Sequence, residues 1–196
     1  MLWNAFKIAF SMYSKVPMPR TDWNERNMRY SLCFFPLIGA LIGGLLIGAS
    51  KLLELAHAGS VLTGAVLFLI PIAVTGGIHL DGFLDTCDAV GSHRSREEKL
   101  EILKDSRCGA FSVIGACTAF ALGVGIYSGF TFRRALLMAP AFILSRALSG
   151  IAVVTFPNAR GSGLAKTFSD AAARARVRVR ITLIILAVLA DRKSVV

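Results

Sequence analysis

Four long apolar runs divide this chain, and they restrict its fold more than any other feature. Three of them carry no charged residue, and the fourth is interrupted only by Arg146. Because the hydrocarbon core of a bilayer is about 30 Å thick, a spanning helix needs about 20 apolar residues. The runs cover residues 30–50, 58–78, 109–132 and 135–159. The sequence therefore predicts an all-α fold, a polytopic transmembrane helix bundle with four full helices.

The composition fits a chain that is surrounded by lipid. Hydrophobic residues make up 55% of the 196 residues and charged residues only 17%, against about 25% in soluble domains. A soluble domain of this size needs a more polar surface. The net charge of +10 comes from basic residues that flank the apolar runs. We therefore interpret the charge as a topology signal, predict the lipid bilayer as a partner and exclude nucleic acid.

Basic residues gather on alternate sides of the apolar runs. They are frequent in the N-terminal stretch, in residues 79–107 and in residues 157–180. The loops on the other side hold only Lys51, Arg133 and Arg134. Since loops rich in lysine and arginine stay in the cytoplasm, we predict a multi-pass protein whose acidic segment between helices two and three is cytoplasmic.

We expect a single integral membrane domain over residues 1–190. Glycines four residues apart form two pairs in the first run, Gly39 with Gly43 and Gly44 with Gly48. Small residues at this spacing let two membrane helices approach closely. Both pairs therefore predict helix packing faces.

The last apolar run is too short to cross a bilayer. It begins at Ile181 and holds ten residues before Asp191, about half of what a spanning helix needs. Residues 191–196 match the translation of a common sequencing-library adapter. We therefore expect a partial fifth helix, a non-native tail over 191–196 and a natural protein that is longer.

The polar segment after the second run concentrates the acids. Seven of the chain's twelve carboxylates lie between Asp81 and Asp105. Asp81, Asp85 and Asp88 have i, i+4, i+7 spacing, which places them on one face of a helix within an arc of about 60°. Like charges at this spacing repel, and an acid inside a membrane costs about 2.5–3.5 kcal/mol. Mg²⁺ with oxygen ligands would offset both costs, so we predict that these three acids bind metal and act in phosphoryl transfer.

Polar and basic residues around the acids complete the predicted site. His79 comes shortly before the first aspartate, and Lys104, Asp105, Ser106 and Arg107 follow the acidic stretch. Placed on one helical face, Lys104 and Arg107 would hold a diphosphate. Two simpler interpretations stay open: the basic residues could be anchors at the membrane surface, and the acids could form a solvated face.

Arg146 stands alone within the fourth apolar run. An arginine inside a membrane is costly unless it faces a polar cavity or an acid partner. We therefore include Arg146 among the candidate substrate-binding residues.

Two stretches, residues 76–88 and 100–109, together resemble a known family. The first reads Gly-Gly-Ile-His-Leu-Asp-Gly-Phe-Leu-Asp-Thr-Cys-Asp and the second Leu-Glu-Ile-Leu-Lys-Asp-Ser-Arg-Cys-Gly. Both are similar to motifs of the cobalamin synthases, also called adenosylcobinamide-GDP ribazoletransferases. Further similar stretches are 17–19, 35–39, 156–160 and 163–165. The resemblance covers nearly all of residues 1–190.

The resemblance implies a Mg²⁺-dependent enzyme of cobalamin biosynthesis in the inner cell membrane of a prokaryote. Such a transferase joins adenosylcobinamide-GDP to α-ribazole, or to α-ribazole 5′-phosphate, and releases GMP; the product is adenosylcobalamin or its 5′-phosphate. By their chemistry, the three aspartates would bind Mg²⁺ or activate the attacking hydroxyl. His79 would orient a carboxylate or transfer a proton, and Lys104, Arg107 and Arg160 would neutralise phosphate charge.

A membrane transporter is the main alternative, with the acidic cluster and Arg146 as an ion or proton site. Against it, the acids gather near one predicted membrane face, and no internal repeat is visible. A non-catalytic scaffold gives no reason for the acidic and basic groups within residues 79–107. The sequence leaves the oligomeric state open, a homo-oligomer included.

Overall fold

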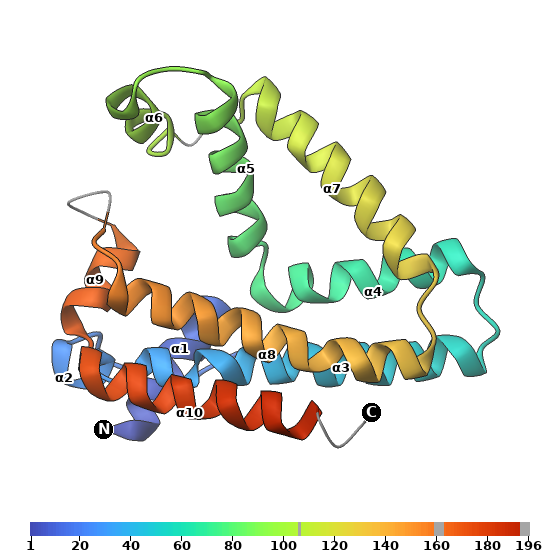
Figure 1. Ribbon diagram of the computed structural model, residues 1–196, viewed down its shortest axis with the longest axis horizontal. Coiled ribbons are helices and arrows are strands. Elements are labelled where there is room, and N and C mark those ends of the chain that lie inside the picture. The colour runs from blue at the N-terminus through green and yellow to red at the C-terminus, as the bar shows by residue number, and fades with distance from the viewer. Residues whose placement is uncertain (106, 159–162, 193–196) are drawn as a thin grey trace. The chain divides into compact units, whose positions relative to one another are not determined.

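The computed structural model describes residues 1–105, 107–158 and 163–192, and these residues form helices without a strand. The predicted all-α class is therefore confirmed (Figure 1). In chain order the elements are α1 (Leu2–Tyr13), α2 (Glu25–Met28), the 3₁₀ helix η1 (Ser31–Phe34), α3 (Phe35–Leu55), α4 (Ser60–Thr75), α5 (Ile78–Gly91), α6 (Arg96–Ile102), α7 (Ala110–Ser128), α8 (Phe132–Thr155), α9 (Leu164–Ala171) and α10 (Arg174–Arg192).

Several helices are apolar and long enough to cross a membrane. In the described part of the chain these are Glu25–Leu55, which ends in α3, Ala110–Ser128, which is α7, and Phe132–Thr155, which is α8. Helices α4 and α5 pass the same test only as a pair, and they are bent by 96° at the break between them. The helices are those of a multi-pass membrane protein, as the apolar runs predict. The second run differs from expectation because its helix continues, across a bend, into the acidic segment.

The chain forms two compact units. One comprises Met1–Gly48 and Arg133–Val196, and the other comprises Ala49–Phe132. The fully buried core of the first unit includes Ile8, Leu32, Phe168, Val177 and Ile181. Residues on α5 and residues on α8 to α10 therefore belong to different units. The single membrane domain expected over 1–190 stays a prediction.

In the first unit, α3 and α8 lie side by side because glycines leave room for the approach (Figure 1). A Cβ on Gly39 would lie 2.8 Å from the Ile143 Cα, and one on Gly43 would lie 3.0 Å from the Ala139 Cβ. The first predicted glycine face is therefore confirmed. The second pair differs: a Cβ on Gly44, or on the glycine four residues later, would meet no atom of the described residues within 4 Å.

Replacing Gly39 with leucine is expected to destabilise the first unit. The added side chain would collide with the α8 backbone, and overpacking of this kind costs about 1–3 kcal/mol. Thermal unfolding in a fixed detergent should show a lower Tm for Gly39→Leu. Gly44→Leu is the matched control on the same helix and should unfold near the wild-type temperature. Equal Tm values for Gly39→Leu and wild type would contradict the close approach.

The second unit is built around the sharp bend between α4 and α5. Gly76 ends α4 and Gly77 begins α5, with φ of 64° and 82°. Glycine adopts this left-handed backbone without steric cost. Helix α7 packs against both helices, and Figure 1 shows it running from the far end of α5 back to α4. A Cβ on Gly64 would lie 2.9 Å from the Ser128 nitrogen, so α4 and α7 also approach closely.

Candidate active site

A single helix, α5, carries the four residues predicted to be catalytic. His79, Asp81, Asp85 and Asp88 all lie within Ile78–Gly91. The helix begins as the Asp81 amide donates a hydrogen bond of 2.8 Å to the Gly77 carbonyl. Because residues three or four apart on a helix are neighbours, the three acids stem from one side of α5, as their spacing predicts. Their carboxylates nevertheless have different surroundings.

Asp81 lies at the bend, beside a pocket of about 470 Å³. The lining residues are Gly76, Gly77, Ile78, Leu80, Asp81 and Leu84. The two glycines expose backbone to the pocket, and Asp81 is the one charged residue in this lining. Sites for small molecules have volumes of about 300–1,000 Å³. The bend therefore offers a ligand-sized pocket with an exposed carboxylate at its wall.

Asp88 has a structural role at the other end of α5. Its Oδ2 accepts a hydrogen bond of 2.7 Å from the Gly109 amide, and its Oδ1 accepts one of 2.9 Å from the Ser112 amide. The buried Ser112 hydroxyl lies within hydrogen-bond reach of this carboxylate and of the Leu84 carbonyl. These amides open α7, where a helix leaves its first N–H groups unpaired. Asp88 therefore caps α7 and ties α5 to it.

The acids of α5 are not gathered as three ligands around one point. Within residues 1–105, 107–158 and 163–192, no group of three or more His, Cys, Asp or Glu side chains is arranged to hold a metal ion. The carboxylate of Asp88 is engaged by α7. Asp81 and Asp85 are the two acids of α5 outside this cap. Metal binding by all three acids stays a prediction.

The prediction that Lys104 and Arg107 share a helical face is wrong. Helix α6 ends at Ile102 and α7 begins at Ala110, so both basic residues lie in the connecting turn. The Asp105 side chain accepts a hydrogen bond of 3.0 Å from the Arg107 amide. Such a side-chain turn competes with the helix for backbone groups. The local chemistry of Asp105 therefore overrides the helical spacing.

Ion pairs occupy both basic groups of this turn. Lys104 Nζ lies 2.5 Å from Glu101 Oε1, and Arg107 Nη2 lies 2.7 Å from Asp105 Oδ2. The hydrogen bonds from Arg107 lower the pKa of Asp105 to about 2. Because this pKa is depressed, the pair is present at neutral pH and is lost only as the pH falls through about 2. The Arg107 side chain is 87% exposed and accessible to an anionic ligand, while Ser106 lies outside the described residues.

The two remaining candidates, Arg146 and Arg160, belong neither to α5 nor to the turn between α6 and α7. Arg146 lies on α8 in the first unit, where its Nη1 donates to the Ser145 hydroxyl at 3.3 Å. Its Nε is buried and has no hydrogen-bond partner among the described residues. Substrate binding by Arg146 stays a prediction. Arg160 lies outside the described residues.

Sequence reasoning gave Gly109 no role beyond its place in the family-like stretch 100–109, and it missed Ser112. A signal was present, because a glycine just before an apolar helix marks a helix start, and helix starts attract carboxylates. A Cβ on Gly109 would lie 2.5 Å from Asp88 Oδ1. Glycine is therefore required where the acid reaches the amides of α7.

Comparison with known proteins shows which family this architecture belongs to. Residues 5–196 match the family described as cobalamin-5-phosphate synthase. The chain belongs to this family. The match includes all of the second unit and, from residue 5 onward, the first unit.

Relatives of this synthase-family chain bear the name adenosylcobinamide-GDP ribazoletransferase. One from Lachnoclostridium phytofermentans is 48% identical over 169 residues, which are 86% of this chain and 65% of the relative. One from Clostridium perfringens strain 13 is 32% identical over 191 residues, 95% of this chain and 75% of the relative. One from Clostridium botulinum strain Eklund 17B is 39% identical over 129 residues, 66% of this chain and 51% of the relative. The chain thus spans less than two thirds of the length of the first and third of these relatives. No solved structure matches it significantly.

Proposed function

We propose that the protein is an adenosylcobinamide-GDP ribazoletransferase. It joins adenosylcobinamide-GDP to α-ribazole, or to α-ribazole 5′-phosphate, and releases GMP. The observation that carries the proposal is the family match over residues 5–196, supported by 48% identity to a relative of that name. An acid-bearing helix beside a ligand-sized pocket, followed by a basic turn, suits a reaction at a diphosphate.

In the proposed reaction one phosphorus–oxygen bond forms and another breaks. The ribazole hydroxyl oxygen attacks the phosphorus that is attached to cobinamide, and the GMP oxygen leaves. The hydroxyl proton passes to a base on α5, for which His79 is the candidate. Phosphoryl transfer asks the protein mainly for positioning and charge stabilisation, which the helix and turn can supply.

The residues of α5 fit Mg²⁺ as a site with two carboxylates. Asp81 lines the pocket at the bend, and Asp85 follows one turn later on the same side of the helix. Mg²⁺ is usually held by one or two carboxylates together with substrate phosphates, with several waters retained. With Asp88 engaged in capping α7, α5 leaves two carboxylates for the ion, which agrees with this preference. The bound ion would supply positive charge at the diphosphate oxygens.

The turn between α6 and α7 is the proposed phosphate contact of this unit. Arg107 presents a planar fork of donors that matches phosphate oxygens, and Lys104 adds a point charge. Exposed ion pairs such as theirs contribute little, so a diphosphate can replace Asp105 and Glu101 as the partner. We also propose that this segment faces the cytoplasm of a prokaryotic cell, because it is rich in lysine and arginine.

GMP release tests the proposed function. Protein reconstituted in phospholipid vesicles with Mg²⁺, adenosylcobinamide-GDP and α-ribazole 5′-phosphate should yield GMP and the cobalamin product in equal amounts. Chelation of Mg²⁺ with EDTA should stop both. Folded protein that yields no GMP would contradict the proposal, and ion flux across the vesicles without GMP would favour the transporter.

A further inference from the structure

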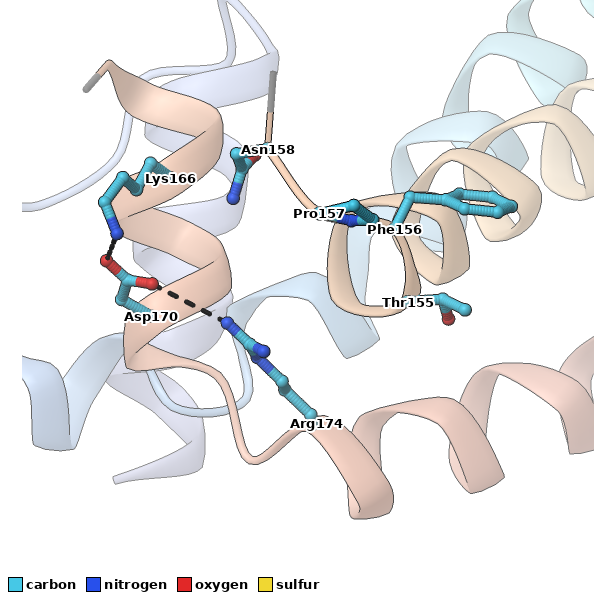
Figure 2. A pocket seen from close by; sticks show the side chains of 7 residues that line it. All are labelled: Thr155, Phe156, Pro157, Asn158, Lys166, Asp170 and Arg174. Atoms are coloured by element: carbon cyan, nitrogen blue, oxygen red, sulfur yellow. Dashed lines mark hydrogen bonds and ion pairs between the residues drawn. The ribbon is translucent and has the colours of Figure 1, made fainter. Parts of the chain in front are cut away.

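We propose that the first unit holds a second site, a pocket that binds the phosphate of a nucleoside 5′-phosphate through Lys166 and Arg174. The pocket has a volume of about 440 Å³ and lies where the end of α8 faces α9 and the start of α10 (Figure 2). Its polar lining residues are Thr155, Asn158, Lys166, Asp170 and Arg174. None of them belongs to α5 or to the pocket at the bend.

Two cations share one acid in this pocket. Lys166 Nζ lies 2.7 Å from Asp170 Oδ2, and Arg174 Nη2 lies 3.6 Å from Asp170 Oδ1. Figure 2 shows Asp170 between the two basic side chains, which reach it from α9 and from the start of α10. One negative charge against two positive charges leaves a net charge of +1. The group is therefore suited to receive an anion.

Helix stability does not explain where these charges stand. Lys166 lies in the first turn of α9 and Asp170 in its last turn. The start of a helix carries partial positive charge and its end partial negative charge, so each residue stands at the end that disfavours it. A lysine that precedes its acid by four residues is also the weaker order for a helical pair. A ligand anion beside Lys166 would account for the lysine at this position.

Arg174 is held in place by the chain before any ligand arrives. Its Nε donates to the Ser169 carbonyl at 3.2 Å, and its Nη2 donates to the Ser169 hydroxyl at 3.2 Å. Ser169 is only 1% exposed and is a firm anchor. A guanidinium has five N–H donors, so others remain for phosphate oxygens. An arginine that is already ordered loses less entropy when it binds a ligand.

The pocket suits a nucleotide better than a bare phosphate ion. Its volume of about 440 Å³ falls in the range of about 300–1,000 Å³ for small-molecule sites. Asn158 and Thr155 add uncharged hydrogen-bonding groups, and Phe156 is an exposed apolar residue of the lining. The identity of the nucleotide rests on the proposed function, in which α-ribazole 5′-phosphate and GMP both carry a phosphate monoester.

Binding of paired ligands tests the pocket. Isothermal titration calorimetry of the protein in phosphatidylcholine nanodiscs compares α-ribazole 5′-phosphate with α-ribazole, and GMP with guanosine. At least one phosphorylated ligand should bind about tenfold more tightly than its partner, because charge-assisted hydrogen bonds are strong. Lys166→Gln should remove most of this difference. Asp170→Asn deletes the competing acid and should tighten the phosphorylated ligand several-fold.

Lys51→Gln is the matched control, because Lys51 forms a comparable surface ion pair of 3.2 Å with Glu54 in the second unit. It should leave all four affinities unchanged. An unchanged phosphate preference in Lys166→Gln, or weaker binding in Asp170→Asn, would overturn the proposal. The proposal would also be overturned if, in nanodiscs that contain anionic lipid, Lys166→Gln weakened the binding of that lipid and changed the affinity for neither nucleotide. These titrations involve no turnover, so their failure would leave the GMP-release test of the proposed function intact.

Discussion

Asp81→Asn is expected to lower kcat for GMP release by about 10³-fold, because one charge-stabilising group at a reaction site is worth about 10²–10³ in rate and Asp81 also serves as a proposed metal ligand. The side chain is exposed and lines the pocket at the bend, so the substitution removes charge with little change in packing. The protein should therefore fold and insert as wild type does. The rate is measured as GMP released at saturating substrate.

The Mg²⁺ dependence should change together with the rate. With one carboxylate lost, the Mg²⁺ concentration for half-maximal activity should rise by about tenfold or more. Asp85→Asn should act in the same way, since Asp85 lies one turn further along α5. A titration of GMP release against Mg²⁺ separates this effect from a simple loss of rate.

Glu97→Gln provides the control for both variants. Glu97 is an exposed acid in the first turn of α6, away from the pocket lining. Its substitution should change neither the rate nor the Mg²⁺ dependence. Full activity of Asp81→Asn would exclude this carboxylate from the metal site. A lower Tm together with lost activity would assign Asp81 a structural role instead.

The membrane helices could be predicted because lipid fixes their length. The apolar runs 30–50, 109–132 and 135–159 correspond to segments that the structure shows as apolar helices. Paired glycines can end a helix, as Gly76 and Gly77 do between α4 and α5. The angle of 96° between the two helices could not be predicted from the sequence, because left-handed glycine permits a bend while tertiary packing, here that of α7, sets its direction.

Only those features of the site that depend on helical spacing could be predicted from the sequence. The positions of Asp81, Asp85 and Asp88 on one helix follow from the sequence alone. The role of Asp88 does not, because its partner Gly109 lies 21 residues away. The prediction that Lys104 and Arg107 share a helical face was wrong for a related reason. A hydrogen bond to the Asp105 side chain outweighed the periodicity of the charged residues. Long-range and local polar contacts are both invisible to a periodic pattern.

Asp88→Ala is expected to loosen the junction of α5 with α7 and to lower kcat about hundredfold, since small displacements of a site cost about that much. The substitution leaves the amides of Gly109 and Ser112 without their acceptor. Hydrogen exchange at these amides should become about tenfold faster or more, because an uncapped helix start opens more often. Mass spectrometry of peptides that cover the start of α7 measures the change.

Thr86→Ala is the control on the same helix, because the Thr86 hydroxyl donates within α5, to the Gly82 carbonyl at 2.7 Å. It should leave both exchange in α7 and GMP release near wild type. The Mg²⁺ dependence of Asp88→Ala then shows whether Asp88 positions α7 or binds the metal ion. Since Asp88 acts by holding α7, its loss should reduce the rate without raising the Mg²⁺ requirement. If Asp88→Ala instead raises that requirement while α7 exchanges as in wild type, Asp88 is a metal ligand and the site with two carboxylates is wrong.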